Sequence, residues 1–362
     1  MPDWVIKQQK VRRFLEEKRL EAFVFSLRSS FAWLTDGGES SVDESMQTGA
    51  ADLVITQNKA YVIAPNNEMD RLLEEVLGDQ GYEPVVYSWR GDRLSVLQNL
   101  LKDKKAGSDT ALSECREMCR EVKALRFELL PEERHRMREL GIQAAEIVGQ
   151  VARQIRPGDS EIKVAGKLKS KMAKAGISVP VILVAFDDRI KKFRHPLPTE
   201  NKIKKTVMVI VCARRWGLTV ALTRLVHFGA LPEDLRKRHN MVSSIEAELI
   251  GSTLPGTCVK DIFNQACRAY EDAGYPGEWE KHHQGGAIGY DTREYLADPD
   301  CEEIVMENQG FAWNPFLEDV KSEDTIITSS KGPELITLDK NWPVKFYEKN
   351  SYRIPLAEIL II

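Results

Sequence analysis

Histidine side chains that could transfer protons occur at two places along this 362-residue chain, each beside residues typical of a ligand pocket. The stretch HHQGGAIGY, residues 282–290, sets two histidines before small residues and a tyrosine. The other place is His195, which follows Arg194 and precedes Pro196. Histidine is the side chain best suited to general base work near neutral pH, so these positions are the first candidates for chemistry.

Charged residues in and after this part of the chain could bind an anionic ligand. Arg293 follows the HHQGGAIGY stretch, and a guanidinium can bind a carboxylate through two parallel hydrogen bonds. Glu323 stands in the polar run KSEDT, where it could act on a substrate or simply pair with Lys321 or Arg293. Two interpretations therefore stay open: a pocket that takes an anion, or charges that neutralise one another.

Composition and charge exclude several classes of function. Hydrophobic residues make up 43% and charged residues 29%, as in ordinary soluble globular proteins. The net charge of -4 and the lack of a Lys/Arg stripe argue against a nucleic-acid partner. No apolar stretch approaches the ~20 residues of a membrane helix, and the N-terminus has no signal-peptide pattern. The six cysteines show neither CxxC nor disulfide-framework spacing, which predicts reduced thiols and a cytoplasmic location.

The elements that must position these residues fall into two domains, because 362 residues exceed what one core usually serves. Residues 1–125 alternate helix and strand signals, which predicts a small α/β domain that ends in a charged helix near 113–127. In residues 126–362 a long helix from Pro131 and a second helix, which Ser160 can cap, precede strands. Two further helices at about 232–252 and 259–273 and short final strands follow. This order predicts an α+β domain with a mostly antiparallel sheet covered by helices. His195 is expected on a strand edge, facing away from Arg194.

Four ordered motifs carry a resemblance to a known family. They are RHPLPTENKIKK (194–205), VIVCARRWGLTVALTR (209–224), HHQGGAIGY (282–290) and SEDTIITSSKGPELIT (322–337). In these motifs the chain resembles the creatinase, aminopeptidase P and methionine aminopeptidase family, whose fold is called pita-bread. The resemblance implies a creatinase- or prolidase-like N-terminal α/β domain over 1–125, a pita-bread domain over 126–362, and a homodimer.

The resemblance also implies how the metal site has changed. Active members of the family hold two divalent metals with two Asp, one His and two Glu, and the two ions activate one bridging water. Those positions fall on Ile210, Ala221, Gly286, Asn308 and Glu323, or on Glu307 instead of Asn308 if the alignment slips by one residue. Isoleucine, alanine and glycine side chains donate nothing to a cation. The resemblance therefore implies no metal at this position and no cofactor.

Roles for the remaining polar residues follow from the same resemblance. His195 corresponds to the catalytic histidine of creatinase, His282 to another family histidine, and His283 is the poorer candidate of its pair. Arg293 stands where a further family histidine is expected. We therefore expect three catalytic residues, His195, His282 and Glu323, and four substrate-binding residues, Arg293, Asn308, Trp313 and Tyr290. The carboxylates with which creatinase binds its guanidinium are replaced by Thr223 and Asn308, which argues against creatine as the substrate.

The sequence thus predicts a metal-independent hydrolase that cleaves a C–N bond in a small amide-like or anionic molecule. Two alternatives stay open: a non-catalytic descendant that binds a peptide or metabolite, and an active Xaa-Pro metallopeptidase. The expected partners are a small-molecule or short-peptide ligand and a second copy of the chain, with neither nucleic acid nor membrane.

Overall fold

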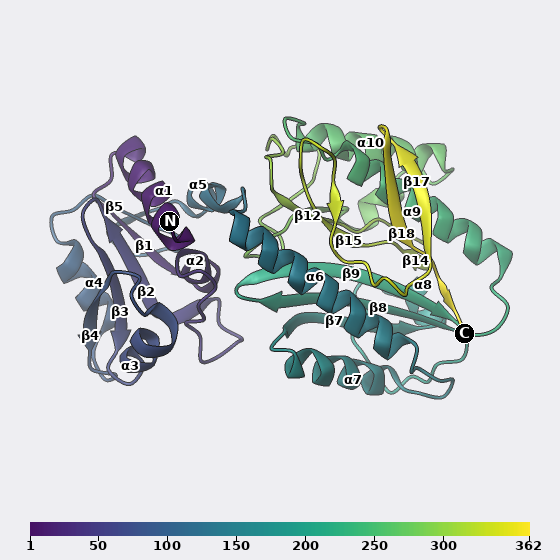
Figure 1. Ribbon diagram of the computed structural model, residues 1–362, viewed down its shortest axis with the longest axis horizontal. Coiled ribbons are helices and arrows are strands. Elements are labelled where there is room, and N and C mark those ends of the chain that lie inside the picture. The colour runs from purple at the N-terminus through teal and green to yellow at the C-terminus, as the bar shows by residue number, and fades with distance from the viewer. The chain divides into compact units, whose positions relative to one another are not determined.

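The computed structural model describes residues 1–362, and the chain divides into two compact units, Met1–Phe127 and Glu128–Ile362 (Figure 1). The boundary lies two residues beyond the one expected from the sequence, after the short helical turn Ala124–Arg126. No helix has the length and apolar character needed to cross a membrane.

The first unit is built on a six-stranded mixed sheet in the order β4-β3-β2-β1-β5-β6. Its strands are β1 (Ala22–Leu27), β2 (Thr48–Thr56), β3 (Ala60–Pro65), β4 (Tyr82–Tyr87), β5 (Ala106–Ser108) and β6 (Cys115–Glu117). Its helices are α1 (Asp3–Lys18), α2 (Arg28–Leu34), α3 (Met69–Arg71) with the π-helical segment Leu72–Leu77, α4 (Arg93–Leu101) and α5 (Cys119–Lys123). The run that forms β1 is buried except at its last residue, Leu27, because β1 lies between β2 and β5 inside the sheet.

The prediction of a charged helix near 113–127 is wrong for the first half of that range. Glu114 has φ 69°, in the left-handed region that a right-handed helix excludes. The chain therefore enters strand β6 before it begins helix α5.

The second unit begins with two helices, α6 (Pro131–Ala152) and α7 (Glu161–Lys174), which pack on the sheet formed by β7, β8 and β9 (Figure 1). Ser160 caps α7 as expected, since its hydroxyl accepts a hydrogen bond from the Lys163 N–H at 3.3 Å. The sheet has the order β19-β9-β8-β7, with strands β7 (Ser178–Phe186), β8 (Thr206–Arg215), β9 (Leu218–His227) and β19 (Leu360–Ile361). Strand β9 is buried along its whole length.

A second, five-stranded antiparallel sheet in the order β11-β10-β12-β15-β16 lies against β9. Its strands are β10 (Gly285–Ala287), β11 (Tyr295–Leu296), β12 (Gly310–Trp313), β15 (Asp324–Ile327) and β16 (Glu334–Leu335). The remaining strands form two hairpins, β13 (Phe316–Leu317) with β14 (Val320–Lys321), and β17 (Val344–Lys349) with β18 (Tyr352–Ala357). The remaining helices are α8 (Asp188–Lys192), α9 (Glu233–Ser252), α10 (Val259–Asp272) and the 3-10 turn Glu278–Lys281. Helices α9 and α10 have the bounds that their apolar periodicity predicted, to within one residue.

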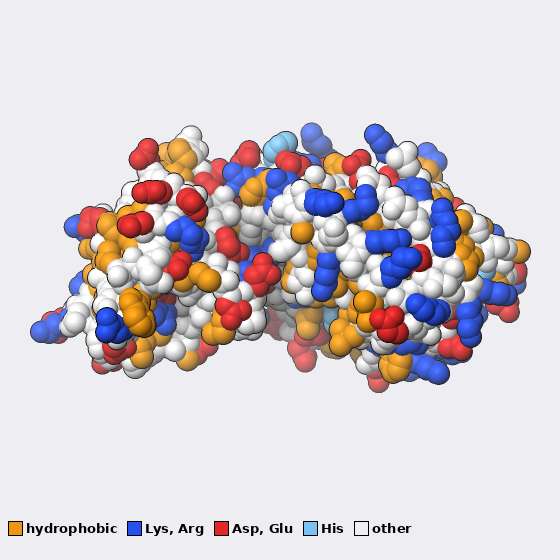
Figure 2. All heavy atoms as spheres, turned by 90° about the horizontal axis from the view of Figure 1, so that it is seen from below, with side chains coloured by type: hydrophobic (Ala, Val, Ile, Leu, Met, Phe, Trp, Pro, Cys, Tyr) orange, Lys and Arg blue, Asp and Glu red, His pale blue; other side chains and the backbone are white.

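The surface carries interspersed charges, and on the face in Figure 2 many Lys and Arg side chains lie over the second unit. Helix α7, with the sequence EIKVAGKLKSKMAK, supplies some of the lysines of this unit, and its Lys163 pairs at 2.5 Å with Asp159, which precedes the helix. Such paired charges are typical of a solvated helix face.

Candidate active site

His195 lies in the loop between α8 and β8, so its expected place on a strand edge is wrong. The chain leaves α8 at Phe193, and the prolines Pro196 and Pro198 lack the N–H groups that strand pairing requires. The loop presents His195 to a second histidine, with the Nε2 atoms of His195 and His282 3.3 Å apart. Two of the expected catalytic residues are therefore brought together from positions 87 residues apart.

A third imidazole completes this cluster. The chain bends at His282, and the ring of His283 stacks on that of His282 with centroids 4.4 Å apart. One ring nitrogen from each of His195, His282 and His283 lies within 4.8 Å of the other two. His283, expected to be the poorer candidate of its pair, thus belongs to the site. We refer to these three residues as the histidine cluster.

Burial lowers the pKa of every imidazole in the histidine cluster, to about 3 at His282 and to about 4 at His283. Burial also lowers the pKa of His195, and the positive charge of Lys321 lowers all three values further. The rings are therefore neutral at pH 7.

In a neutral His282 the Nδ1 atom, 2.6 Å from the carbonyl oxygen of His283, must carry the proton, because a carbonyl only accepts. The Nε2 atom of His282 consequently has a free lone pair.

Glu323 is held by three partners and lies between strands β14 and β15. Its carboxylate lies 2.9 Å from the ammonium of Lys321 and 3.7 Å from the guanidinium of Arg293, and it accepts a hydrogen bond from Thr223 Oγ1 at 2.6 Å. Burial acts to raise the pKa of Glu323, but the two cations and the hydrogen bonds outweigh it and lower the pKa to about 2. Glu323 and Arg293, both expected in the site, are therefore brought together as an ionised group with Lys321.

Strand pairing places the first two positions that correspond to family metal ligands in the interior. Ile210 on β8 faces Thr223 on β9, and Ala221 on β9 faces Cys212 on β8. Ile210 and Ala221 are 3% and 0% exposed. The hydroxyl of Thr325 bonds to both the N–H and the C=O of Ala221 at 2.8 Å, which ties β9 to β15. The side chains at 210 and 221 offer no donor atom at this place.

The backbone around Gly286 leaves no space for a side chain. Gly286 has φ 150° in strand β10, and an added Cβ would lie 2.3 Å from the carbonyl oxygen of Tyr295. The neighbouring Gly285 has φ 120°, and its Cβ would lie 2.2 Å from the carbonyl oxygen of Ala312. Glycine is therefore required by close packing of β10 between β11 and β12.

Three residues expected to bind substrate are engaged elsewhere. Trp313 is fully buried, and its indole N–H donates to Thr253 at 3.0 Å. The hydroxyl of Tyr290 donates to Glu133 on α6 at 2.5 Å. Asn308 sits in a left-handed turn, where its side-chain oxygen accepts a hydrogen bond from Arg134, and its neighbour Glu307 accepts one from the N–H of Ser330 at 2.8 Å. Each of these side chains is thus engaged within the fold, and its role in substrate binding stays a prediction.

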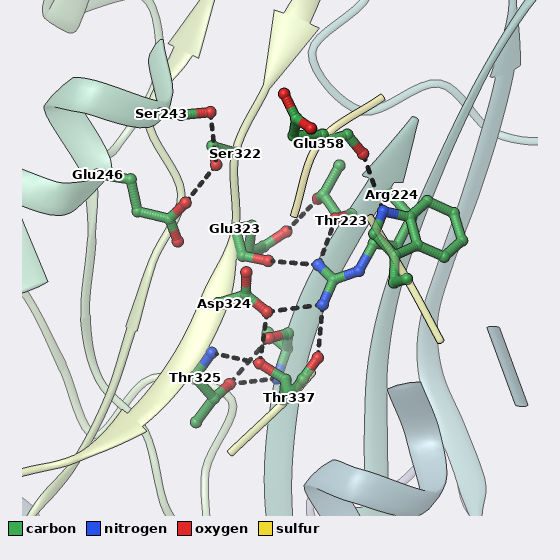
Figure 3. A network of polar contacts seen from close by, with 12 residues as sticks. Thr223, Arg224, Ser243, Glu246, Ser322, Glu323, Asp324, Thr325, Thr337 and Glu358 are labelled. Carbon is green, nitrogen blue, oxygen red and sulfur yellow. Dashed lines mark hydrogen bonds and ion pairs between the residues drawn. The ribbon is translucent and has the colours of Figure 1, made fainter. Parts of the chain in front are cut away.

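The alternation of side chains along residues 321–325 separates the site from a buried structural network (Figure 3). Lys321 and Glu323 face the site, whereas Asp324 pairs with Arg224 at 2.8 Å, and both of these are 1% exposed. The guanidinium of Arg224 also donates to the carbonyl oxygens of Thr223 and Thr337. On the same side as Asp324, Ser322 donates to Glu246 of helix α9. This network fixes the strand that carries Glu323.

His195 also lines an open groove of about 690 Å³ between α7, β7 and the loop at 195–198. Its walls are mainly apolar, with Val181, Ile182 and Leu197 among them. Strand β7 is the outer strand of its sheet, so the groove runs beside an unpaired edge. The histidine cluster thus borders a surface that can hold an apolar part of a ligand.

Two residues of the site were missed by the sequence reasoning or given too little weight. Lys321 was expected only as a partner that neutralises Glu323, although strand alternation indicates that residues i and i+2 share a face. His283 was set aside because adjacent residues in an extended segment point to opposite faces. No local sequence signal predicts the bend at His282 that brings both rings together.

Comparison with known proteins agrees with this architecture. Residues 135–332 match the profile of metallopeptidase family M24. Two curated proteins from strains of Staphylococcus epidermidis, each described as an uncharacterized peptidase, are 25% identical over 198 residues, covering 51% of this chain and 54% of theirs. The chain therefore matches these curated relatives over only about half of their length.

Solved structures of low sequence identity share the whole fold. A prolidase from Thermococcus sibiricus has a TM-score of 0.81 at 16% identity, with 100% of both chains covered. The Xaa-Pro dipeptidase from Bacillus anthracis has a TM-score of 0.77 at 18% identity, covering 99% of this chain and 100% of its own. The N-terminal domain of FACT complex subunit SPT16 from chickpea, Cicer arietinum, has a TM-score of 0.67 at 12% identity, covering 92% and 96%. The family profile spans more than half of the chain, and the chain therefore belongs to metallopeptidase family M24, with a prolidase-like α/β domain followed by a pita-bread domain.

Proposed function

We propose that this protein hydrolyses a C–N bond in a short peptide or small amide that carries a carboxylate, without the two-metal centre of its family. The observation that carries the proposal is the contact between neutral His195 and neutral His282, at 3.3 Å, beside a carboxylate that Lys321 already neutralises.

The residues at the family's metal position do not fit two divalent ions. Ile210 and Ala221 present hydrocarbon, and Gly286 has no room for an imidazole. Glu323, the one matching ligand, is bonded to Lys321 and Thr223 instead. No step of the proposed reaction therefore passes through a dinuclear centre.

The histidine pair supplies a path for a proton. Because His282 Nε2 has a lone pair, the Nε2–H of His195 donates to it, and the Nδ1 of His195 is left as the free base. In the proposed reaction this Nδ1 takes a proton from water as the water oxygen attacks the carbonyl carbon. The protonated His195 then returns this proton to the departing nitrogen of the substrate as the C–N bond breaks, which regenerates the free base. General base catalysis of this kind contributes roughly 10²–10⁴-fold in rate.

Two cations against one carboxylate give the site a positive balance. Lys321 and Arg293 both face Glu323, and the Nε atom of Arg293 is buried without a hydrogen-bond partner. A ligand carboxylate supplies an acceptor for that N–H and the missing negative charge. The apolar groove beside His195 would hold the side chain of the same substrate.

The test is turnover of a library of dipeptides, N-acyl amino acids and cyclic amides by chelator-treated protein, followed by mass spectrometry. We expect at least one substrate whose turnover is lost in His195→Ala while its binding persists. Arg293→Ala should weaken binding of the same compound by ~2–5 kcal/mol, the usual cost of removing one partner of a desolvated charge pair. His135→Ala, at an exposed position of α6, is the matched control and should change neither turnover nor binding of the compound.

The pattern of results separates the alternatives. Binding that depends on Arg293 without any turnover supports a non-catalytic peptide-binding descendant. Turnover that persists in His195→Ala contradicts the assigned base.

A further inference from the structure

The three imidazoles of the histidine cluster have the separation of ligands on one ion. Two nitrogen ligands at ~2.0–2.1 Å from a tetrahedral zinc lie about 3.3–3.4 Å apart. The Nε2 atoms of His195 and His282 are 3.3 Å apart, and the nitrogen offered by His283 lies within 4.8 Å of both. An ion held by all three residues would draw this third nitrogen closer to the other two.

The hydrogen bonding of His282 also matches that of a metal ligand. Histidines that bind metals donate their other ring N–H to a carbonyl or carboxylate, which fixes the tautomer and aims the free lone pair. Here the Nδ1–H of His282 is held by the backbone carbonyl of His283 at 2.6 Å, and the Nε2 lone pair faces the cluster.

A second, independent observation comes from His283. Its Nδ1 atom is buried and has no hydrogen-bond partner. A buried ring nitrogen without a partner is costly unless a ligand satisfies the ring.

We propose that His195, His282 and His283 bind a single transition-metal ion, with Zn²⁺ the best-fitting one, and leave a fourth ligand position open. Three neutral imidazoles suit zinc, copper and nickel rather than magnesium or calcium, which prefer oxygen ligands. The site is separate from the family's two-metal position at Ile210, Ala221 and Gly286.

The surrounding charges decide what fills the fourth position. Lys321 and Arg293 outnumber Glu323 by one charge, which opposes a bare dication. An anionic fourth ligand, such as hydroxide or a carboxylate, reduces that repulsion and gains from both cations. Zinc and a small carboxylate should therefore bind cooperatively.

This site goes beyond the proposed function and would regulate it. The ion takes up the Nε2 atoms of His195 and His282, through which the proton of the hydrolysis would pass. Bound zinc would therefore suppress a metal-independent turnover, and zinc binding can be measured whether or not any substrate is ever found.

The experiment is a Zn²⁺ titration of the chelator-stripped full chain, read by competition with a chromogenic chelator. We expect one ion per chain, with affinity weakened at least about 10-fold in His195→Asn and in His283→Asn, and unchanged in His135→Ala. The same titration with Co²⁺ should give the visible absorption of a tetrahedral complex. Circular dichroism shows whether each variant folds.

A measurement on the unsubstituted protein keeps the test independent of variant folding. Zinc should shift the imidazole nitrogen resonances of three of the six histidines, and should leave those of His135, His227 and His239 in place. The absence of any stoichiometric Zn²⁺ uptake, or uptake that both variants retain with wild-type affinity, would overturn the site.

Discussion

The ammonium of Lys321 lies 2.9 Å from the carboxylate of Glu323, and the two side chains are only 3% and 2% exposed. Two charges in the interior are stable only as a pair, since either alone would be desolvated without compensation. Lys321 therefore neutralises the buried Glu323 without a bound ion.

Substitution of Lys321 should show how strongly the stability of the fold depends on the pair of Lys321 with Glu323. Lys321→Met leaves Glu323 with Arg293 at 3.7 Å and Thr223, and we expect a loss of ~3–5 kcal/mol in the free energy of unfolding. The double variant Lys321→Met/Glu323→Gln should recover much of that loss. Urea denaturation provides the measurement. Lys281→Met is the control, because Lys281 is 61% exposed in its pair with Glu278 and should cost at most ~1 kcal/mol. A Lys321→Met loss no larger than the control's would contradict the buried-pair interpretation.

Xaa-Pro dipeptides should not be cleaved at rates that depend on manganese or cobalt. Without ions at Ile210, Ala221 and Gly286, attacking water has no Lewis acid to lower its pKa there. Release of free proline from dipeptides, with and without added Mn²⁺ or Co²⁺, is the measurement. Metal-stimulated proline release that Glu323→Ala abolishes would sink this prediction, and with it the loss of the two-metal centre.

Glu246 should make the protein less stable as the pH rises. Burial, and then the nearby charge of Asp324, raises the pKa of Glu246 well above its usual value, and its Oε1 atom has no partner. A carboxyl whose pKa is raised by folding gives full stability below its unfolded pKa, ~4.3, and loses about 1.4 kcal/mol per pH unit above it until the folded pKa is reached. Glu246→Gln removes this slope. The free energy of unfolding of the variant should therefore rise relative to that of the wild type as the pH increases from 4.5 to 8.

Urea denaturation at several pH values tests this sign. The control is Glu248→Gln on the same helix, since Glu248 is 23% exposed and pairs with Lys349. Parallel stability curves for wild type and Glu246→Gln would show that Glu246 is ionised in the folded protein.

Gly286→Ala should destabilise the fold by about 2–4 kcal/mol, because the new Cβ meets the Tyr295 carbonyl oxygen at 2.3 Å and the backbone has φ 150°. Gly166→Ala is the opposite case: no atom lies within 4 Å of its Cβ position in helix α7, and it should stabilise by ~0.5–1 kcal/mol. Thermal denaturation of the two variants gives the comparison. Equal melting temperatures would show that β10 can shift to admit a side chain.

Elements with a strong local signal could be predicted from the sequence. Helix α9 and helix α10 follow from apolar periodicity, and α7 begins at the Ser160 cap. The two domains and the fold class were correct for the same reason, since several ordered motifs agree on them. Within the candidate site, the structure brings Glu323 close to Arg293 and His195 close to His282, and their roles stay predictions.

Residues whose role depends on distant contacts could not be predicted. Trp313 was assigned to the ligand although its partner Thr253 lies 60 residues away in the core. Asn308 was assigned to the pocket although Arg134 on α6 takes up its amide oxygen. A local sequence pattern indicates which face of a strand a side chain occupies. The residue that the side chain contacts across the sheet is set by tertiary packing, which the local pattern does not contain.

The alternation along residues 321–325 makes this stretch sensitive to length rather than to composition. A deletion or insertion of one residue in the turn at Glu318 and Asp319 would turn every following side chain to the other face of the strand. Asp324 would then enter the site, and Glu323 would meet Arg224. A substitution of a single side chain removes one contact, whereas a change of register would exchange the side chains that face the candidate site with those that face the buried network.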